Sequence, residues 1–308
     1  GVENLGKVNY ASSIVSYFVL FAALGFKTYA VREGSALKGD IKKLTVFTSQ
    51  IFSLELCTVV ISFISYLLCI AFIPNFSGYR LLLFINSAAI FATWIGVNWI
   101  NVVFEDYLII TIRSIALHIL MLVFMFIFVK DETDYYIYSG INVFSNLALN
   151  MLNFVYIRKY VKPQITLRTN VKSHIKPVLV FFSNQLALSV YLNSDTTMLG
   201  WIIGDIPVGL YSVSVRIYTA IKTLLAALYN VAIPRMANLA GEGKDDELKR
   251  VLDVVINSII FVAIPATFGL FITSVDVVRI ISGDAYVDAA PSLRILSIAF
   301  LFAVLGGV

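Results

Sequence analysis

Ionisable side chains within long apolar stretches are the residues of this sequence best placed to do chemistry. Arg216 and Lys222 lie in the apolar stretch 209–233, and Asp195 lies in the stretch before it. Placing a charge at the centre of a membrane helix costs about 2.5–3.5 kcal/mol on insertion scales, so such a charge usually has a function. A fixed cation there could bind phosphate, which lysine does as a point charge and arginine as a fork.

Lys222 is predicted to line a cavity. If the helix is centred near Ile221, Lys222 lies at the midplane and Arg216 lies about 7.5 Å outward. The helical face of Lys222 also carries aromatic rings, those of Tyr211, Tyr218 and Tyr229. Rings beside one ammonium suit a cavity that receives a diphosphate and stacks sugars. The alternative is a helix–helix seam with interfacial tyrosines.

Asp195 is predicted at about the depth of Arg216, on the preceding antiparallel helix. The two could form a structural ion pair, or a gate or ion-coupling site that opens when the carboxylate is protonated. Asp195 could also simply be hydrated near the outer surface. Glu55, in an earlier stretch, could take up H+ or Na+, or it could belong to a polar seam. Arg113 could meet an incoming diphosphate, or it could anchor the cytoplasmic end of its helix.

Several chemistries are not supported by the sequence. It has no phosphate-binding run of the Walker A type, and its two Cys and two His give no metal cluster. We expect no cofactor, no metal and no nucleic-acid partner. The links predicted on the outer side, 74–79, 130–134 and 204–208, are too short to carry a catalytic domain. The sequence therefore predicts a protein that is not an enzyme.

The elements that position these residues are nine apolar stretches. Most have 18 or more residues, the length that a helix needs to cross about 30 Å of hydrocarbon. The mean hydropathy is +0.87 and only 14% of residues are charged. The sequence predicts an all-α, polytopic membrane protein with these spans: 9–26, 44–73, 80–104, 112–129, 135–157, 178–203, 209–233, 251–275 and 291–308.

The distribution of basic residues predicts the topology. Sixteen of the 23 Lys and Arg lie in the links after the first, third, fifth and seventh spans, and five lie in the opposite links. The positive-inside rule places the rich links in the cytoplasm and Gly1 on the other side. Trp94 and Trp99, near the cytoplasmic end of the third span, are then expected in the interfacial aromatic belt.

Two pseudo-symmetric lobes are predicted. The link from Arg158 to Lys176 has six bases and no acids, and it divides five spans from four. We expect an N-terminal lobe at 1–160, a basic cytoplasmic linker at 161–177 and a C-terminal lobe at 178–308. The segment 10–17 resembles 211–218, which indicates a repeat about an axis along the membrane normal. Twelve helices are inferred for the whole, so one is expected before Gly1 and two after Val308.

An ordered set of segments resembles the oligosaccharide flippases, the Wzx-type polysaccharide biosynthesis proteins of the MOP exporter superfamily. The segments are Leu5–Tyr10, Ser16–Phe21, Leu24–Gly25, Tyr29–Glu33, Asp195–Gly200, Val208–Arg216, Ser282–Asp284, Ala289 and Leu293–Leu296. The similarity runs along nearly all of the chain. One departure lies within Trp99–Glu105, where the family pattern has Gln-Gly before the Glu and this sequence has Val-Phe.

The resemblance implies a flippase that moves polyprenyl-diphosphate-linked oligosaccharide across the bacterial inner membrane, for O-antigen lipopolysaccharide or capsule. It implies two six-helix lobes that alternate access to a central cavity, and as partners membrane lipids, H+ or Na+, and polysaccharide polymerase machinery. Two alternatives belong to the same superfamily, a cation-coupled multidrug exporter and a peptidoglycan-precursor flippase. A membrane-embedded polysaccharide polymerase or ligase is a further alternative, from a different class.

Overall fold

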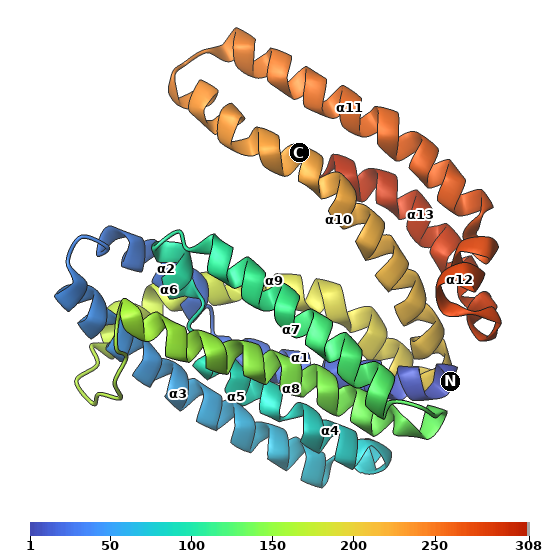
Figure 1. The fold of residues 1–308 in the computed structure, drawn as a ribbon, viewed down its shortest axis with the longest axis horizontal. Helices are drawn as coiled ribbons and strands as arrows, with labels where there is room; N and C mark the ends of the chain where they lie inside the picture. The colour runs from blue at the N-terminus through green and yellow to red at the C-terminus, as the bar shows by residue number, and fades with distance from the viewer. Residues whose placement is uncertain (307–308) are drawn as a thin grey trace. The chain divides into compact units, whose positions relative to one another are not determined.

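The computed structural model describes residues 1–306, except for the side chains of residues 172, 226–231, 234, 237 and 305 (Figure 1). The described chain is mostly helical and contains no strand. Its long helices are α1 (Val2–Ala23), α2 (Phe26–Ala36), α3 (Ile41–Phe72), α7 (Tyr107–Phe128), α8 (Tyr135–Tyr156), α9 (Val171–Ile202), α10 (Asp205–Gly241), α11 (Asp245–Ile272) and α13 (Ala290–Leu305). The short ones are α4 (Arg80–Asn86), α5 (Ala88–Ile95), α6 (Trp99–Val103), α12 (Ser274–Ser282), η1 (Pro74–Tyr79), η2 (Glu132–Asp134), η3 (Ile157–Lys159) and η4 (Asp284–Ala289).

Eight segments of the described residues are long and apolar enough to cross a membrane. They correspond to eight of the nine predicted spans. The remaining prediction, 209–233, falls within α10, which has 37 residues. The prediction of an all-α, multi-pass membrane protein is confirmed.

The contacts within the chain define two compact units. The first unit is Lys7–Gly204, and the second combines Gly1–Gly6 with the chain from Asp205 onward. This division does not test the predicted lobes at 1–160 and 178–308, which stay a prediction. Helix α9 begins at Val171, inside the predicted linker, and its residues His174 and Val178 are buried in the first unit.

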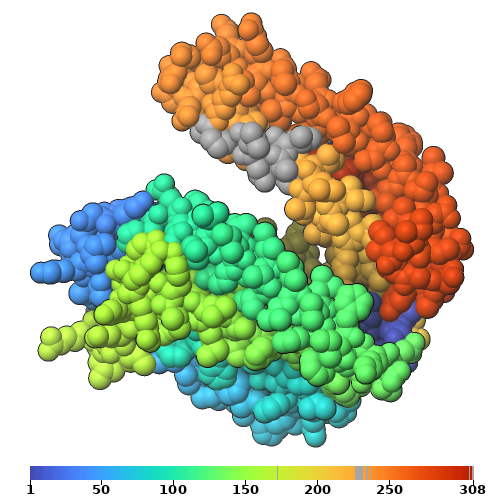
Figure 2. All heavy atoms as spheres, in the orientation of Figure 1, coloured from blue at the N-terminus to red at the C-terminus, as the bar shows by residue number. Residues whose placement is uncertain are grey.

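One end of the first unit is closed by a core between α2, α3, α6 and α9. Phe26, Leu44 and Val178 are among its buried residues. Trp99 also belongs to it and is 2% exposed, so its predicted place in the interfacial belt is wrong. Gly34 makes room for it, since a Cβ at Gly34 would lie 2.9 Å from the indole ring. The loop 160–170 and α2 lie at this same end (Figure 2).

The first predicted span is divided by a sharp turn. Helix α1 ends at Ala23 and α2 begins at Phe26, with positive φ angles at Leu24 and Gly25. Gly25 has φ +79°, and a Cβ there would lie 2.7 Å from the backbone nitrogen of Phe182 in α9. A glycine therefore serves both the turn and the close approach of α9.

The third predicted span is also discontinuous. Helices α4, α5 and α6 follow one another in place of one helix over 80–104, and α5 ends at Ile95 with Gly96 as its C-cap. Non-helical backbone is tolerated at membrane depth only where protein covers it. At Gly96 the cover is α8, because a Cβ at Gly96 would lie 2.7 Å from Oδ1 of Asn150.

The second unit is built on α10, which packs against α11 and α13. One cluster joins Leu225, Ile259 and Phe300, and a second joins Val213 and Ile217 to α12, η4 and the start of α13. These contacts fix the faces of α10 on which Arg216 and Lys222 lie.

Candidate transport site

Lys222 is a half-buried cation beside an aromatic ring. Its Nζ lies 5.9 Å from the centroid of the Tyr218 ring. Tyr218 in turn meets Phe300 of α13 edge-on, with the centroids 6.2 Å apart. Among the described residues, Lys222 has no acidic partner. The side chain of Tyr229, predicted on the same face, lies outside the described residues.

Arg216 lines a pocket of about 320 Å³ within the second unit. Apolar walls come from Leu5, Val213, Ile217 and Ile281, and polar groups come from Ser282 and Tyr286. Tyr211 lies half-buried one turn and a half before Arg216 on α10. The structure thus places Tyr211, Arg216, Tyr218 and Lys222 along one helix, with Lys222 directly beside Tyr218.

Asp195 is half-buried in α9, and its Oδ1 accepts a hydrogen bond of 2.9 Å from the backbone of Thr196. It belongs to the first unit, whereas Arg216 belongs to the second. Their pairing stays a prediction.

A polar and close-packed seam joins α1 to α9. The Thr197 hydroxyl donates to Ser13 Oγ at 3.1 Å and lies 3.3 Å from the Tyr17 hydroxyl. A Cβ at Gly200 would lie 2.2 Å from the ring of Tyr10. The segments Ser16–Phe21 and Asp195–Gly200, which carry part of the family resemblance, therefore meet at one helix interface.

Arg113 is held by asparagines inside the first unit. Its guanidinium donates to Oδ1 of Asn153 at 2.6 Å and to Oδ1 of Asn98 at 3.1 Å. Asn153 also accepts from Asn101, and Asn98 donates to Oδ1 of Asn150 at 3.0 Å. No carboxylate of the described chain pairs with Arg113.

The asparagines of α8, of which Asn153 bonds directly to Arg113, were missed by the sequence analysis. Asn142, Asn146, Asn150 and Asn153 follow one another at intervals of four, four and three residues. This spacing places all four on one face of a helix. A polar stripe on an otherwise apolar membrane helix was the signal that could have revealed the network.

Asp106 organises a second polar cluster, in the link between α6 and α7. Its Oδ2 accepts hydrogen bonds from the hydroxyls of Tyr156 (2.5 Å) and Tyr160 (2.7 Å), and from Lys159 Nζ (3.1 Å). These donors, the two tyrosines first, lower the pKa of Asp106 to about 2. Asp106 therefore stays ionised and ties the ends of two helices together.

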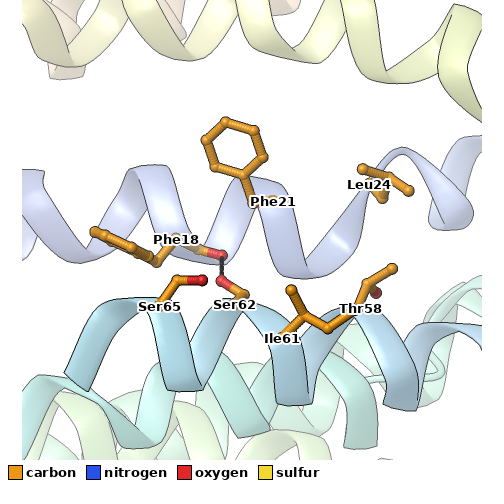
Figure 3. A pocket seen from close by; sticks show the side chains of 7 residues that line it. All are labelled: Phe18, Phe21, Leu24, Thr58, Ile61, Ser62 and Ser65. Atoms are coloured by element: carbon orange, nitrogen blue, oxygen red, sulfur yellow. Dashed lines mark hydrogen bonds between the residues drawn. The ribbon is translucent and has the colours of Figure 1, made fainter. Parts of the chain in front are cut away.

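Glu55 is buried in α3, at 7% exposure, with no ion pair or carboxylate hydrogen bond among the described residues. One turn further along α3, the Thr58 hydroxyl donates to the backbone oxygen of Ala22 at 2.6 Å. Ser62 donates likewise to Phe18 at 2.6 Å (Figure 3). Thr58, Ser62 and Phe18 also line a groove of about 380 Å³ between α1 and α3, whose other walls are mostly apolar.

The comparisons with known proteins agree on a class. A family model described as "Polysaccharide biosynthesis protein" matches residues 1–240. A second model, described as MatE, matches residues 181–308. No solved structure matches the chain.

A curated relative supports the first of these matches. It is a protein of Escherichia coli (strain K12) named "Putative O-antigen transporter", 23% identical over 241 residues. The match covers 77% of this chain and 58% of the relative, so the chain spans less than two thirds of that protein's length. Because the first family model covers well over half of the sequence, the resemblance is confirmed: the chain belongs to the polysaccharide biosynthesis protein family.

Proposed function

We propose that this chain is part of a flippase that moves polyprenyl-diphosphate-linked oligosaccharide from the cytoplasmic to the outer leaflet of the bacterial inner membrane. The family match over residues 1–240 supports the class, and the name of the Escherichia coli relative supports the kind of cargo. The observation that carries the proposal is Lys222, a half-buried cation without an acidic partner among the described residues. A diphosphate brings at least two negative charges into a low-dielectric path, where a fixed cation lowers the barrier strongly.

In this proposal the two lobes alternate access to a cationic cavity. Lys222 meets the diphosphate, Tyr218 and Tyr211 stack on sugars, and Arg216 binds phosphate or pairs with Asp195. Arg113 stands at the cytoplasmic entrance. Asp195 and Glu55 are the acids that could take up H+ or Na+ during the cycle. No step makes or breaks a covalent bond, so the protein is not an enzyme.

A cation-coupled multidrug exporter is the second candidate, favoured by the MatE match over residues 181–308. Exporters of cationic drugs need an acidic cavity, which Glu55 and Asp195 could supply. Lys222 and Arg216 would oppose such a substrate. Drug resistance conferred by the protein, without any effect on surface polysaccharide, would favour the exporter.

The flippase proposal is tested by replacing Lys222 in a strain whose surface polysaccharide depends on this protein. Lys222→Ala is expected to abolish surface polysaccharide at unchanged membrane abundance, and Lys222→Arg to retain part of it. Lys249→Ala, at an exposed position of α11, is the matched control and is expected to be silent. Normal polysaccharide with Lys222→Ala would overturn the site.

A further inference from the structure

The segment between η3 and α9 is held by buried residues at both ends and by hydrogen bonds along its backbone. We call residues 162–170 the strap. Val161 before it and His174 after it are buried in the core of the first unit. His174 lies 2.8 Å from the Tyr29 hydroxyl through Nδ1 and 3.1 Å from Oε1 of Gln50 through Nε2.

The backbone of the strap is also hydrogen-bonded to α3. The amides of Gln164 and Thr166 donate to the hydroxyls of Ser49 (3.1 Å) and Ser53 (2.8 Å). Four residues of helix advance by about 6 Å and two extended residues by about 6.6 Å, so the two spacings match. Between and after these two bonded amides lie Ile165 and Leu167, and both side chains are exposed.

The exposed side chains are apolar, and basic residues flank them. Leu167 is 99% exposed and Ile165 63% exposed. Lys162, Arg168 and Lys176 are exposed, with no acidic partner in the described chain. The stretch 158–176 contains six basic residues and no acid. The hydrogen bonds to α3 therefore hold two exposed apolar side chains next to basic residues that have no acidic partner in the described chain.

The length of α3 places the strap near the membrane surface. Its 32 residues extend about 48 Å, whereas the hydrocarbon core is about 30 Å thick. If the Phe72 end of α3 lies at the edge of the hydrocarbon, about 12 residues at the basic end extend beyond it, and Ser49 and Ser53 fall near the boundary. At that depth the headgroups of the cytoplasmic leaflet are the nearest surface of opposite charge.

We propose that the strap is a membrane-surface anchor that binds anionic phospholipids of the cytoplasmic leaflet. Ile165 and Leu167 enter the interface between headgroups and acyl chains, and Lys162, Arg168 and Lys176 meet the phosphates. Apolar insertion with electrostatic attraction is the combination by which surface segments bind anionic membranes. The anchor does not depend on which substrate the protein carries. It fixes the start of α9 relative to the bilayer surface.

The test follows a fluorophore on the strap of the reconstituted chain. Cys57 and Cys69 are replaced by Ser, and Leu167→Cys is labelled with an environment-sensitive dye. The vesicles are phosphatidylcholine alone or phosphatidylcholine with phosphatidylglycerol. Aqueous iodide and a quencher attached to the lipid headgroup region report the position of the dye. Glu242→Cys, in the exposed turn between α10 and α11, is the matched control.

With phosphatidylglycerol present, we expect a blue shift at position 167, strong quenching from the lipid and several-fold weaker quenching by iodide than at position 242. Replacing Lys162, Arg168 and Lys176 by Gln should remove the difference between the two vesicles. Iodide access at 167 equal to that at 242 in both vesicles would overturn the proposal, as expected if a cytoplasmic protein covers the strap instead. Quenching by the lipid that is the same with and without phosphatidylglycerol, and is unchanged by the Gln substitutions, would overturn the specificity for anionic lipid.

Discussion

Arg113 lies in a candidate membrane span and Lys222 in the predicted span 209–233, and their surroundings differ. Two amide oxygens hold the guanidinium of Arg113, whereas an aromatic ring lies beside the ammonium of Lys222. Two of the N–H donors of Arg113 are therefore already bonded, one to Asn153 of α8 and one to Asn98 just before α6. The ammonium of Lys222 has no hydrogen-bond partner among the described residues, which is why we propose it for the central role.

Asn153 should be essential for the stability of the first unit. It is fully buried and accepts from both Arg113 and Asn101, so Asn153→Ala leaves a half-buried guanidinium short of a partner. We expect a loss of about 3 kcal/mol in the free energy of unfolding, measured in detergent. Asn142→Ala, on the same stripe but bonded only to the Tyr138 carbonyl, is the control and should cost below about 1 kcal/mol. Equal losses would contradict the network.

The lowered pKa of Asp106 should make the stability of the folded protein depend on pH. Its pKa is about 2 in the folded protein and about 4 when unfolded, so its contribution is fully present above pH 4. That contribution is lost as the pH falls from about 4 toward 2. The unfolding temperature of the wild type should fall more steeply in this range than that of Asp106→Asn. Glu105→Gln, which removes the neighbouring exposed carboxylate, should leave the slope unchanged; parallel curves for wild type and Asp106→Asn would refute the assignment.

At the scale of helices, small residues decide how closely the elements approach. Gly200→Ala would force a methyl group of α9 against the ring of Tyr10, which α1 places at the α1–α9 interface. We expect destabilisation of about 1–3 kcal/mol. Gly140→Ala is the matched control, because nothing lies within 4 Å of its Cβ position in α8 and alanine is the better helix former. Thermal unfolding in detergent should separate the two variants, and equal behaviour would argue against a close α1–α9 contact.

Hydropathy predicted where the chain crosses the membrane but not where its helices break. The spans follow from length and apolar content, which are local properties. The breaks at Leu24–Gly25 and at Gly96 depend on distant partners, Phe182 in one case and Asn150 in the other. A short stretch of sequence contains only one of the two residues in each contact, so it cannot reveal the break. Trp99 was misplaced for the same reason, since its burial depends on Gly34.

At the scale of the whole molecule, the family match shows a polysaccharide biosynthesis protein, and the transport of lipid-linked saccharide is our proposal. The sequence identified the ionisable residues within the spans, because such residues stand out from an apolar background. It could not supply the partners of Arg113 or the neighbours of Lys222, which come from other helices. The pairing of Asp195 with Arg216 and the lobe boundary at 161–177 remain predictions.

The most direct test of the central claim is the accessibility of position 222. Lys222→Cys, with Cys57 and Cys69 replaced by Ser, is treated with a small water-soluble thiol reagent, with and without lipid-linked oligosaccharide. Lys249→Cys, on the exposed face of α11, serves as the control that is labelled in both conditions. Our account predicts labelling at position 222 that the substrate blocks. Absence of labelling in both conditions would place the residue in a packed helix seam and contradict a substrate cavity there.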